Sequence, residues 1–178
     1  MISENENKKS RLSFKIVNLR RFLLLALPVI ILGICLDQAV KFWAAAVLKQ
    51  ADRVLIPGVL RLTYVENRGA AFSILRGSRT FFLILTAISL MLGFYAILFV
   101  KIRRVGFWAL SFVMAGAIGN MLDRIRFGYV IDMFEPIFVR FAIFNVADIF
   151  LTLGGITLAL YILFWHDEKT LDGGKEVS

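Results

Sequence analysis

Two aspartates, Asp132 and Asp148, stand where apolar sequence meets polar sequence. Asp132 lies within the mostly apolar segment Gly128–Phe134, and Asp148 directly precedes a long apolar run. A carboxylate in apolar surroundings is costly, so such a residue usually has a function. Two carboxylates that meet can share one proton and work as an acid/base pair. The sequence therefore makes these two residues candidates for proton-transfer chemistry.

Each aspartate also has a simpler interpretation. Asp132 could be a loop residue exposed to water, although its apolar neighbours argue against this and would raise its pKa by desolvation. Asn145 is a good N-cap candidate, which places Asp148 in the first helical turn, where a carboxylate suits the helix dipole. Capping and catalysis both stay open for Asp148 on the residues alone.

Other polar residues lie near the ends of apolar runs. Asp37 and Lys41 are spaced i, i+4, and either form a stabilising ion pair or border a site. Asn120 and Asp123 share one helical face, and Asp123 beside Arg124 can be held ionised in a local network. The simpler interpretation of this second group is a polar cap at a helix end.

Small residues accompany these polar groups. The segment Asn67–Gly69 is a predicted turn, and Asn67 could instead offer its amide to an extended peptide. Gly116 and Gly119 permit close packing of helices in a membrane.

The composition places the chain among integral membrane proteins. Hydrophobic residues make up 59% of its 178 residues, against roughly 45–50% in soluble domains, and the mean hydropathy is +0.77. The net charge is +8, but the basic residues lie beside apolar runs, which disfavours binding of nucleic acid. We therefore expect a membrane protein with no nucleic-acid partner.

Four apolar runs predict an all-α membrane protein with four transmembrane helices at about residues 22–36, 81–100, 105–122 and 149–165. The first run resembles a signal-peptide core, but no small-x-small cleavage site follows, so we expect an uncleaved anchor. Four spans with short connections leave no room for a second core, which predicts a single domain over residues 1–178.

The basic residues also predict an orientation. They precede the first run and separate the second from the third, so both termini are expected to be cytoplasmic. The connections 44–80 and 123–148 then face outward. Within the first, residues 54–65 are rich in β-branched and aromatic residues around a Pro57-Gly58 turn, which predicts short strands at the membrane surface. The polar ends, 1–7 and 169–178, are expected to be disordered.

Cysteine and histidine usage disfavours a metal site. Cys35 is the only cysteine, lies in an apolar run and is expected to be a small buried hydrophobe. His166 is the only histidine. Carboxylates alone could still hold a hard cation, which stays open as a minor alternative.

Five ordered segments together resemble the lipoprotein signal peptidase (signal peptidase II) family of bacteria. They are Asp37–Lys41, Asn67–Phe72, Gly116–Arg124, Gly128–Phe134 and Phe144–Asp148. The resemblance implies a four-span aspartyl endopeptidase of the bacterial cytoplasmic membrane, with its active site on the extracytoplasmic side. Such enzymes cleave diacylglyceryl-modified prolipoproteins on the amino side of the lipidated cysteine.

The resemblance also implies residue roles. Asp132 and Asp148 match the catalytic pair, while Asp123 is a rival that the family pattern assigns to a supporting network. The supporting or substrate-binding positions are Asp37, Lys41, Asn67, Gly69, Gly116, Asn120, Asp123, Arg124, Asn145 and Ala147. Met133 stands where many relatives have phenylalanine, which puts the loop shape in question more than the chemistry.

The implied partners are a lipidated prolipoprotein and membrane lipid, and we expect a monomer that needs no metal or organic cofactor. A small transporter using intramembrane carboxylates is a rival class, but it would more often show inverted repeats and charges in mid-span. A non-enzymatic assembly factor would explain the apolar runs but not the ordered polar segments.

Overall fold

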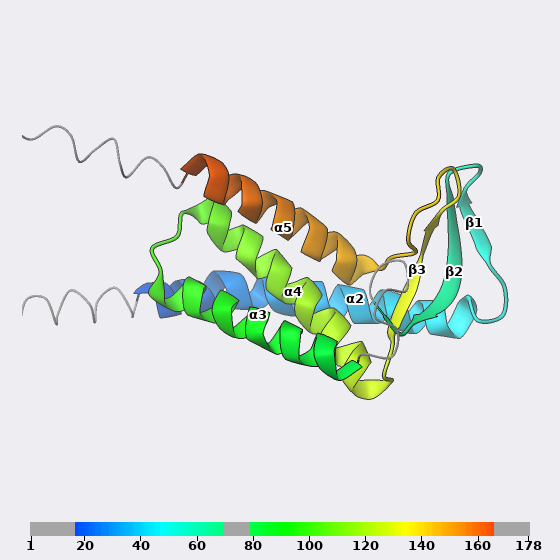
Figure 1. Cartoon of the computed structure of the whole chain (residues 1–178), viewed down its shortest axis with the longest axis horizontal. Coiled ribbons are helices and arrows are strands. Elements are labelled where there is room, and N and C mark those ends of the chain that lie inside the picture. Colours follow the sequence, from blue (N-terminus) through cyan, green and yellow to red (C-terminus); the bar gives the residue numbers. More distant parts are fainter. Residues whose placement is uncertain (1–16, 70–78, 166–178) are drawn as a thin grey trace, which may run out of the picture.

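The computed structural model describes residues 17–69 and 79–165, and its helices lie side by side with a small sheet at one end (Figure 1). Four helices are long and apolar enough to cross a membrane: Val17–Val47, Arg79–Phe99, Arg104–Arg126 and Val146–Phe164. The predicted four-span fold with a small β element is therefore confirmed. The predictions for residues 1–7, 70–72, 166 and 169–178 lie outside the described residues.

The first helix is longer than the predicted span. A π-helical turn, η1 (Phe22–Ala26), leads into α2 (Leu27–Val47), so the helix continues past residue 36 and past the predicted start of the outer connection at residue 44. Its extension carries Asp37 and Lys41, which are buried against neighbouring elements instead of ending the helix. The prediction for Cys35 was wrong, because it is exposed on the outer face of α2, where an apolar side chain suits lipid.

The remaining helices are α3 (Arg79–Phe99), α4 (Arg104–Arg126) and α5 (Val146–Trp165). α4 is the central helix. Of its most apolar 18-residue stretch 61% is buried, against 22%, 11% and 17% for the corresponding stretches of the other three spans. Small residues bring α5 close to it: a Cβ on Gly154 would come 2.8 Å from the Ala109 carbonyl oxygen of α4. The polar residues Ser111, Asn120 and Asp123 of α4 are therefore buried among the neighbouring elements.

The sheet contains β1 (Arg53–Ile56), β2 (Leu60–Asn67) and β3 (Val130–Pro136), in the order β1-β2-β3 with antiparallel neighbours. The strands of the first connection were predicted, but β3 was not. In the register of β2 and β3, Val65 lies opposite Asp132 and Asn67 lies opposite Val130. This pairing brings Asp132 within reach of Asn67 on the neighbouring strand.

The sheet is held to the end of α2 by a small apolar core. The buried members are Ala44, Leu48, Leu62, Ile131 and Met133. Met133 is fully buried at 0% exposure, so the residue that departs from the family pattern still fills an apolar position. The core fixes β3, and with it Asp132, relative to the first membrane helix.

Candidate active site

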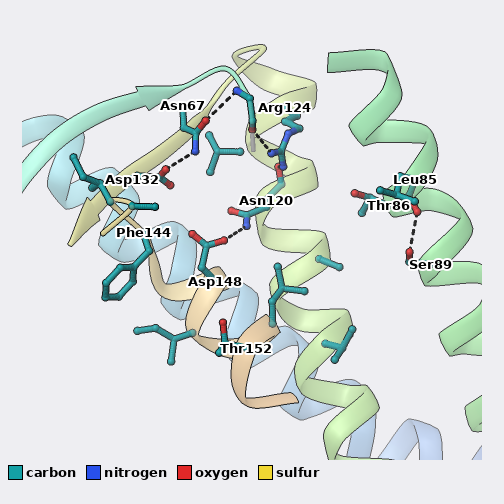
Figure 2. A pocket seen from close by; sticks show the side chains of 18 of the residues that line it. Asn67, Leu85, Thr86, Ser89, Asn120, Arg124, Asp132, Phe144, Asp148 and Thr152 are labelled. Carbon is teal, nitrogen blue, oxygen red and sulfur yellow. Dashed lines mark hydrogen bonds between the residues drawn. The ribbon is translucent and has the colours of Figure 1, made fainter. Parts of the chain in front are cut away.

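Asp132 and Asp148 line one cavity of about 700 Å³ near the sheet end of the helices (Figure 2). Asp132 extends from β3 and is only 2% exposed, while Asp148 lies half-buried in the first turn of α5. Most of the cavity wall is apolar and comes from α3, α4, α5 and the segment before α5. Its lining residues include Leu85, Val113, Ala117, Phe141, Ile143, Phe144, Leu151 and Leu153.

Asp132 is bonded by two side-chain amides. Asn67 Nδ2 donates to Asp132 Oδ2 at 2.8 Å, and Asn145 Nδ2 donates to Asp132 Oδ1 at 2.7 Å. Burial raises the pKa of Asp132 to about 7, and the negative charge of Asp148 adds to the rise, while the two amides and Lys41 oppose it. The water-exposed loop interpretation is therefore wrong, and this carboxyl is set to exchange a proton near neutral pH.

Asp148 both caps its helix and faces the cavity. The backbone N–H of Asn145 donates to Asp148 Oδ2 at 3.1 Å, and the backbone N–H of Asp148 donates to Asn145 Oδ1 at 2.9 Å. This is the reciprocal geometry of a capping box, which confirms the predicted N-cap. Asn120 Nδ2 donates to the other oxygen, Asp148 Oδ1, at 2.8 Å. The two interpretations drawn from the sequence thus describe the same carboxylate.

Lys41 forms the centre of a second polar group behind the cavity. Its ammonium lies 2.9 Å from Asp37 Oδ2 and 2.9 Å from Asp123 Oδ2, and it donates to Asn120 Oδ1 at 2.9 Å. The three donors of the ammonium are therefore matched by three acceptors. Asn145 Nδ2 also donates to Asn120 Oδ1, at 3.1 Å. The amides of Asn120 and Asn145 thus connect the lysine to both cavity carboxylates.

Asp123 lies in a polar network whose cation is Lys41, and no ion pair joins it to the neighbouring Arg124 among the described residues. Adjacent residues on a helix point in different directions, and Asp123 turns toward Lys41. Its carboxylate also accepts from Gln38 Nε2 at 3.0 Å and from the backbone N–H of Ile131 at 3.1 Å. Asp123 does not line the cavity. Its geometry is that of a structural residue.

Gln38 is a site residue that the sequence reasoning missed. Besides Asp123, its amide contacts Asp37 Oδ2 at 3.1 Å and the Gly119 carbonyl oxygen at 3.3 Å, and it accepts from Arg126. Its place in the apolar run directly beside Asp37 was the available signal. Gln38 thus bonds both aspartates of the Lys41 group.

Arg124 holds the Asn67 turn beside the cavity. The backbone N–H of Gly69 donates to Asn67 Oδ1 at 2.9 Å, which confirms the predicted turn as an Asx-turn. Arg124 Nη2 donates to the Gly69 carbonyl oxygen at 3.2 Å, and its guanidinium lies 4.8 Å from the ring centroid of Phe82. Arg124 of α4 therefore contacts the turn that follows β2 and the Phe82 ring of α3 at the wall of the cavity (Figure 2).

The small residues among the predicted positions permit close approach. A Cβ on Gly116 would overlap the Ala147 carbonyl oxygen, and one on Gly119 would come 2.6 Å from Asp37 Oδ2. Ala147 is fully buried, and its backbone N–H donates to Asp37 Oδ1 at 2.8 Å. These residues bring α2, α4 and the start of α5 together at the site.

The carboxylates do not gather into a metal centre in the described ranges. Among residues 17–69 and 79–165, no group of three or more His, Cys, Asp or Glu side chains is placed to hold a metal ion. Nor does either cavity aspartate form an ion pair there. Each is instead bonded by uncharged amides, which leave its proton exchangeable.

The fold and the site define a class: a multi-pass membrane protein with one buried and one half-buried carboxylate in a cavity between its spans. The family model described as signal peptidase (SPase) II matches residues 29–164, and the chain belongs to the signal peptidase II family.

Named relatives and solved structures agree with this assignment. The chain is 44% identical to the lipoprotein signal peptidase of Lactococcus lactis subsp. lactis (strain IL1403), over 82% of this chain and 98% of that protein. It is also 44% identical to the lipoprotein signal peptidase of Streptococcus thermophilus (strain CNRZ 1066), over 81% and 95%. A solved bacterial membrane enzyme, at 34% identity, superposes with a TM-score of 0.73 over 86% of this chain and 93% of its own.

Proposed function

We propose that this protein is an intramembrane aspartyl endopeptidase that removes signal peptides from diacylglyceryl-modified prolipoproteins, cleaving on the amino side of the lipidated cysteine. Membership of the signal peptidase II family supports the substrate class. The observation that carries the aspartyl chemistry is the pair Asp132 and Asp148, which line one cavity and, within residues 17–69 and 79–165, are bonded by amides and not by cations.

In the proposed mechanism the two carboxyls share one proton and hold a water between them. The pKa of about 7 supports placing the resting proton on Asp132, so that Asp148 is the ionised member. The water oxygen attacks the scissile carbonyl carbon, and Asp148 takes a proton from that water. Asp132 donates a hydrogen bond to the developing oxyanion, and the leaving amine then receives a proton.

The surroundings of the pair support a lipidated peptide as substrate. The cavity is walled by apolar side chains of membrane helices, where acyl chains can stay out of water. The amides of Asn67 and Asn120 and the guanidinium of Arg124 line the same cavity and can bond the peptide backbone. We place the enzyme in the bacterial cytoplasmic membrane as a monomer, with both termini cytoplasmic and the site on the extracytoplasmic side.

The test is cleavage by the purified protein in lipid nanodiscs. Two prolipoprotein peptides are compared, one diacylglyceryl-modified at its cysteine and one unmodified. We expect release of the signal peptide from the modified peptide alone, with the new amino terminus at the lipidated cysteine in mass spectrometry. Cleavage of both peptides at equal rates, or cleavage elsewhere, would contradict the proposed specificity.

A further inference from the structure

The sheet ends in an apolar tip formed by two turns, the β1–β2 turn and the turn that follows β3. The backbone N–H of Ile137 donates to the Val59 carbonyl oxygen at 3.0 Å and ties the two turns together. The exposed side chains of this sheet tip are Leu55, Ile56, Val59, Ile137, Phe138 and Val139. Their exposed fractions run from 42% for Val59 to 69% for Phe138.

The sheet tip carries no charged residue of its own. None occurs in the stretches 54–60 and 136–139, which are flanked by Arg53 and Arg61 and by Glu135 and Arg140. Arg61 and Glu135 form an ion pair at 2.7 Å, whereas Arg53 and Arg140 are exposed. In water, a contiguous apolar patch on an open edge strand invites pairing with other chains. An apolar environment would therefore suit the sheet tip, with anionic groups near the arginines at the edge of the tip.

The position of the sheet tip suggests which environment this is. The strands run across the helix axes, and the tip projects sideways from the end of the bundle on the side of α5 (Figure 1). Exposed apolar side chains continue from it to α5 along the open cavity: Phe141 is 58% exposed, Ile149 is 40% exposed and Leu153 is 55% exposed, and all three line the cavity. The tip is thus continuous with the surface that the spans present to lipid.

We propose that the sheet tip inserts its side chains into the membrane interface on the cavity side of the bilayer. Exposed apolar side chains reach the boundary between headgroups and acyl chains, while the backbone of the edge strand stays at headgroup level, where water can bond it. Arg53 and Arg140 then lie at the depth of the lipid phosphates.

Seating the sheet tip in lipid has a consequence for the site. Asp132 belongs to β3, which ends at the tip, whereas Asp148 belongs to the membrane helix α5. Two points then hold the sheet against the bundle: the apolar core on α2 and the lipid contact at the opposite end. The inserted tip therefore limits movement of Asp132 relative to Asp148, whatever reaction the pair carries out.

The insertion can be measured without any assay of cleavage. Cys35 is the only cysteine, so Cys35→Ser gives a background for single labels. Phe138→Cys places an environment-sensitive NBD probe on the tip, and Gln50→Cys places one in the exposed turn between α2 and β1 as a matched control. Both proteins are studied in nanodiscs of phosphatidylcholine and phosphatidylglycerol, with helix content checked by circular dichroism.

We expect the Phe138→Cys probe to emit at shorter wavelength than the Gln50→Cys probe and to be quenched by lipids with a nitroxide near the headgroup. Iodide in the buffer should quench only the control. Two outcomes would overturn the proposal: equal emission and iodide quenching of both probes, or a blue-shifted tip probe that lipid nitroxides do not quench, which indicates a protein contact. If Phe138→Cys fails to fold, Val59→Cys gives the same reading from the other turn.

Discussion

The aspartates at the site fall into two groups that differ in which partners bond their carboxylates. Asp37 and Asp123 lie 2.9 Å from the Lys41 ammonium and are almost fully buried. Asp132 and Asp148 line the cavity, and the described residues that donate to them are uncharged amides and a backbone N–H. The same side chain thus lies against a cation in one place and against uncharged amides in the other.

The difference shows how a membrane protein separates support from chemistry. An aspartate locked to a cation is a poor acid or base at neutral pH, because the neighbouring charge favours its ionised form. An aspartate bonded by amides has fixed oxygen positions but keeps its proton exchangeable. Asn120 joins the two groups, because it bonds Lys41 and Asp148 at once.

The largest expected effect is the loss of cleavage rate when either aspartate of the cavity is replaced. Asp148→Asn and Asp132→Asn each remove one of the two carboxyls that share the proton, and we expect a loss in cleavage rate of about 10³-fold or more, since acid/base groups contribute about 10²–10⁴-fold each. The fold should persist, because an amide is close in shape to a carboxylate. Rates on a lipidated peptide and melting curves in the same nanodiscs measure both quantities.

Asp123→Asn is the matched control for these two substitutions. It changes the same atoms in the Lys41 group, so its main effect should be on stability and not on the chemical step. If Asp123→Asn lost as much rate as Asp148→Asn with an unchanged melting temperature, Asp123 would again be a candidate catalytic residue.

Replacing Lys41 tests the group of aspartates that is bonded by a cation. Lys41→Met leaves Asp37 and Asp123 buried without their counter-charge, and breaking a buried ion pair in this way costs about 3–5 kcal/mol. We expect a lower free energy of unfolding in mixed micelles, followed by circular dichroism. Lys49→Met is the control, since Lys49 is exposed and lies over the Tyr64 ring at 4.7 Å, a contact worth about 1 kcal/mol or less. Equal losses for the two variants would mean that Lys41 is not the structural centre.

The raised pKa of Asp132 predicts a stability difference that depends on pH. Its value is about 7 in the folded protein against 3.8 for the unperturbed group, so the folded state binds more protons between these values. The free energy of unfolding therefore falls, through this group, as pH rises from about 4 to about 7, by up to roughly 4 kcal/mol at 1.36 kcal/mol per pKa unit. Asp132→Asn lacks this loss.

The measurement compares wild type with Asp132→Asn at pH 5 and pH 8. We expect the variant to gain stability relative to wild type between the two values. A constant difference would show that Asp132 is already ionised at pH 5.

Local patterns in the sequence predicted the parts of this structure that local interactions produce. Apolar runs predicted the four spans, and the Pro57-Gly58 turn predicted the first hairpin. The spacing of Asn145 and Asp148 predicted their capping contact, because both partners belong to one helical turn.

Tertiary contacts were the part that the sequence left undetermined. The strand β3 pairs with β2 across 65 residues of chain, so no turn signal marks it, although its apolar and β-branched run was visible. The spacing of Asp37 and Lys41 predicted their pair but not the third partner, Asp123, which depends on α2 packing against α4. Choosing Asp132 and Asp148 over Asp123 depended on the family resemblance.

The smallest expected effect concerns the amide that Asn67 donates to Asp132. This bond favours the ionised form, so Asn67→Ala should raise the pKa of Asp132 further. The alkaline limb of kcat/KM reports loss of the shared proton, so it should move to higher pH, by about one unit or less for a single hydrogen bond. The variant should lose about tenfold or less in rate at its optimum.

The pH profile of kcat/KM distinguishes an effect of Asn67 on the pKa of Asp132 from a contact between Asn67 and the peptide alone. If Asn67 served only to bind substrate, Asn67→Ala would raise KM and leave the limb in place. Thr63→Ala, a substitution on the same strand and outside the cavity lining, should leave the profile unchanged. If the alkaline limb of kcat/KM moved to lower pH instead, Asn67 would favour the protonated form of Asp132. The two groups of aspartates would then differ because of the Lys41 cation alone, and not because of the amides.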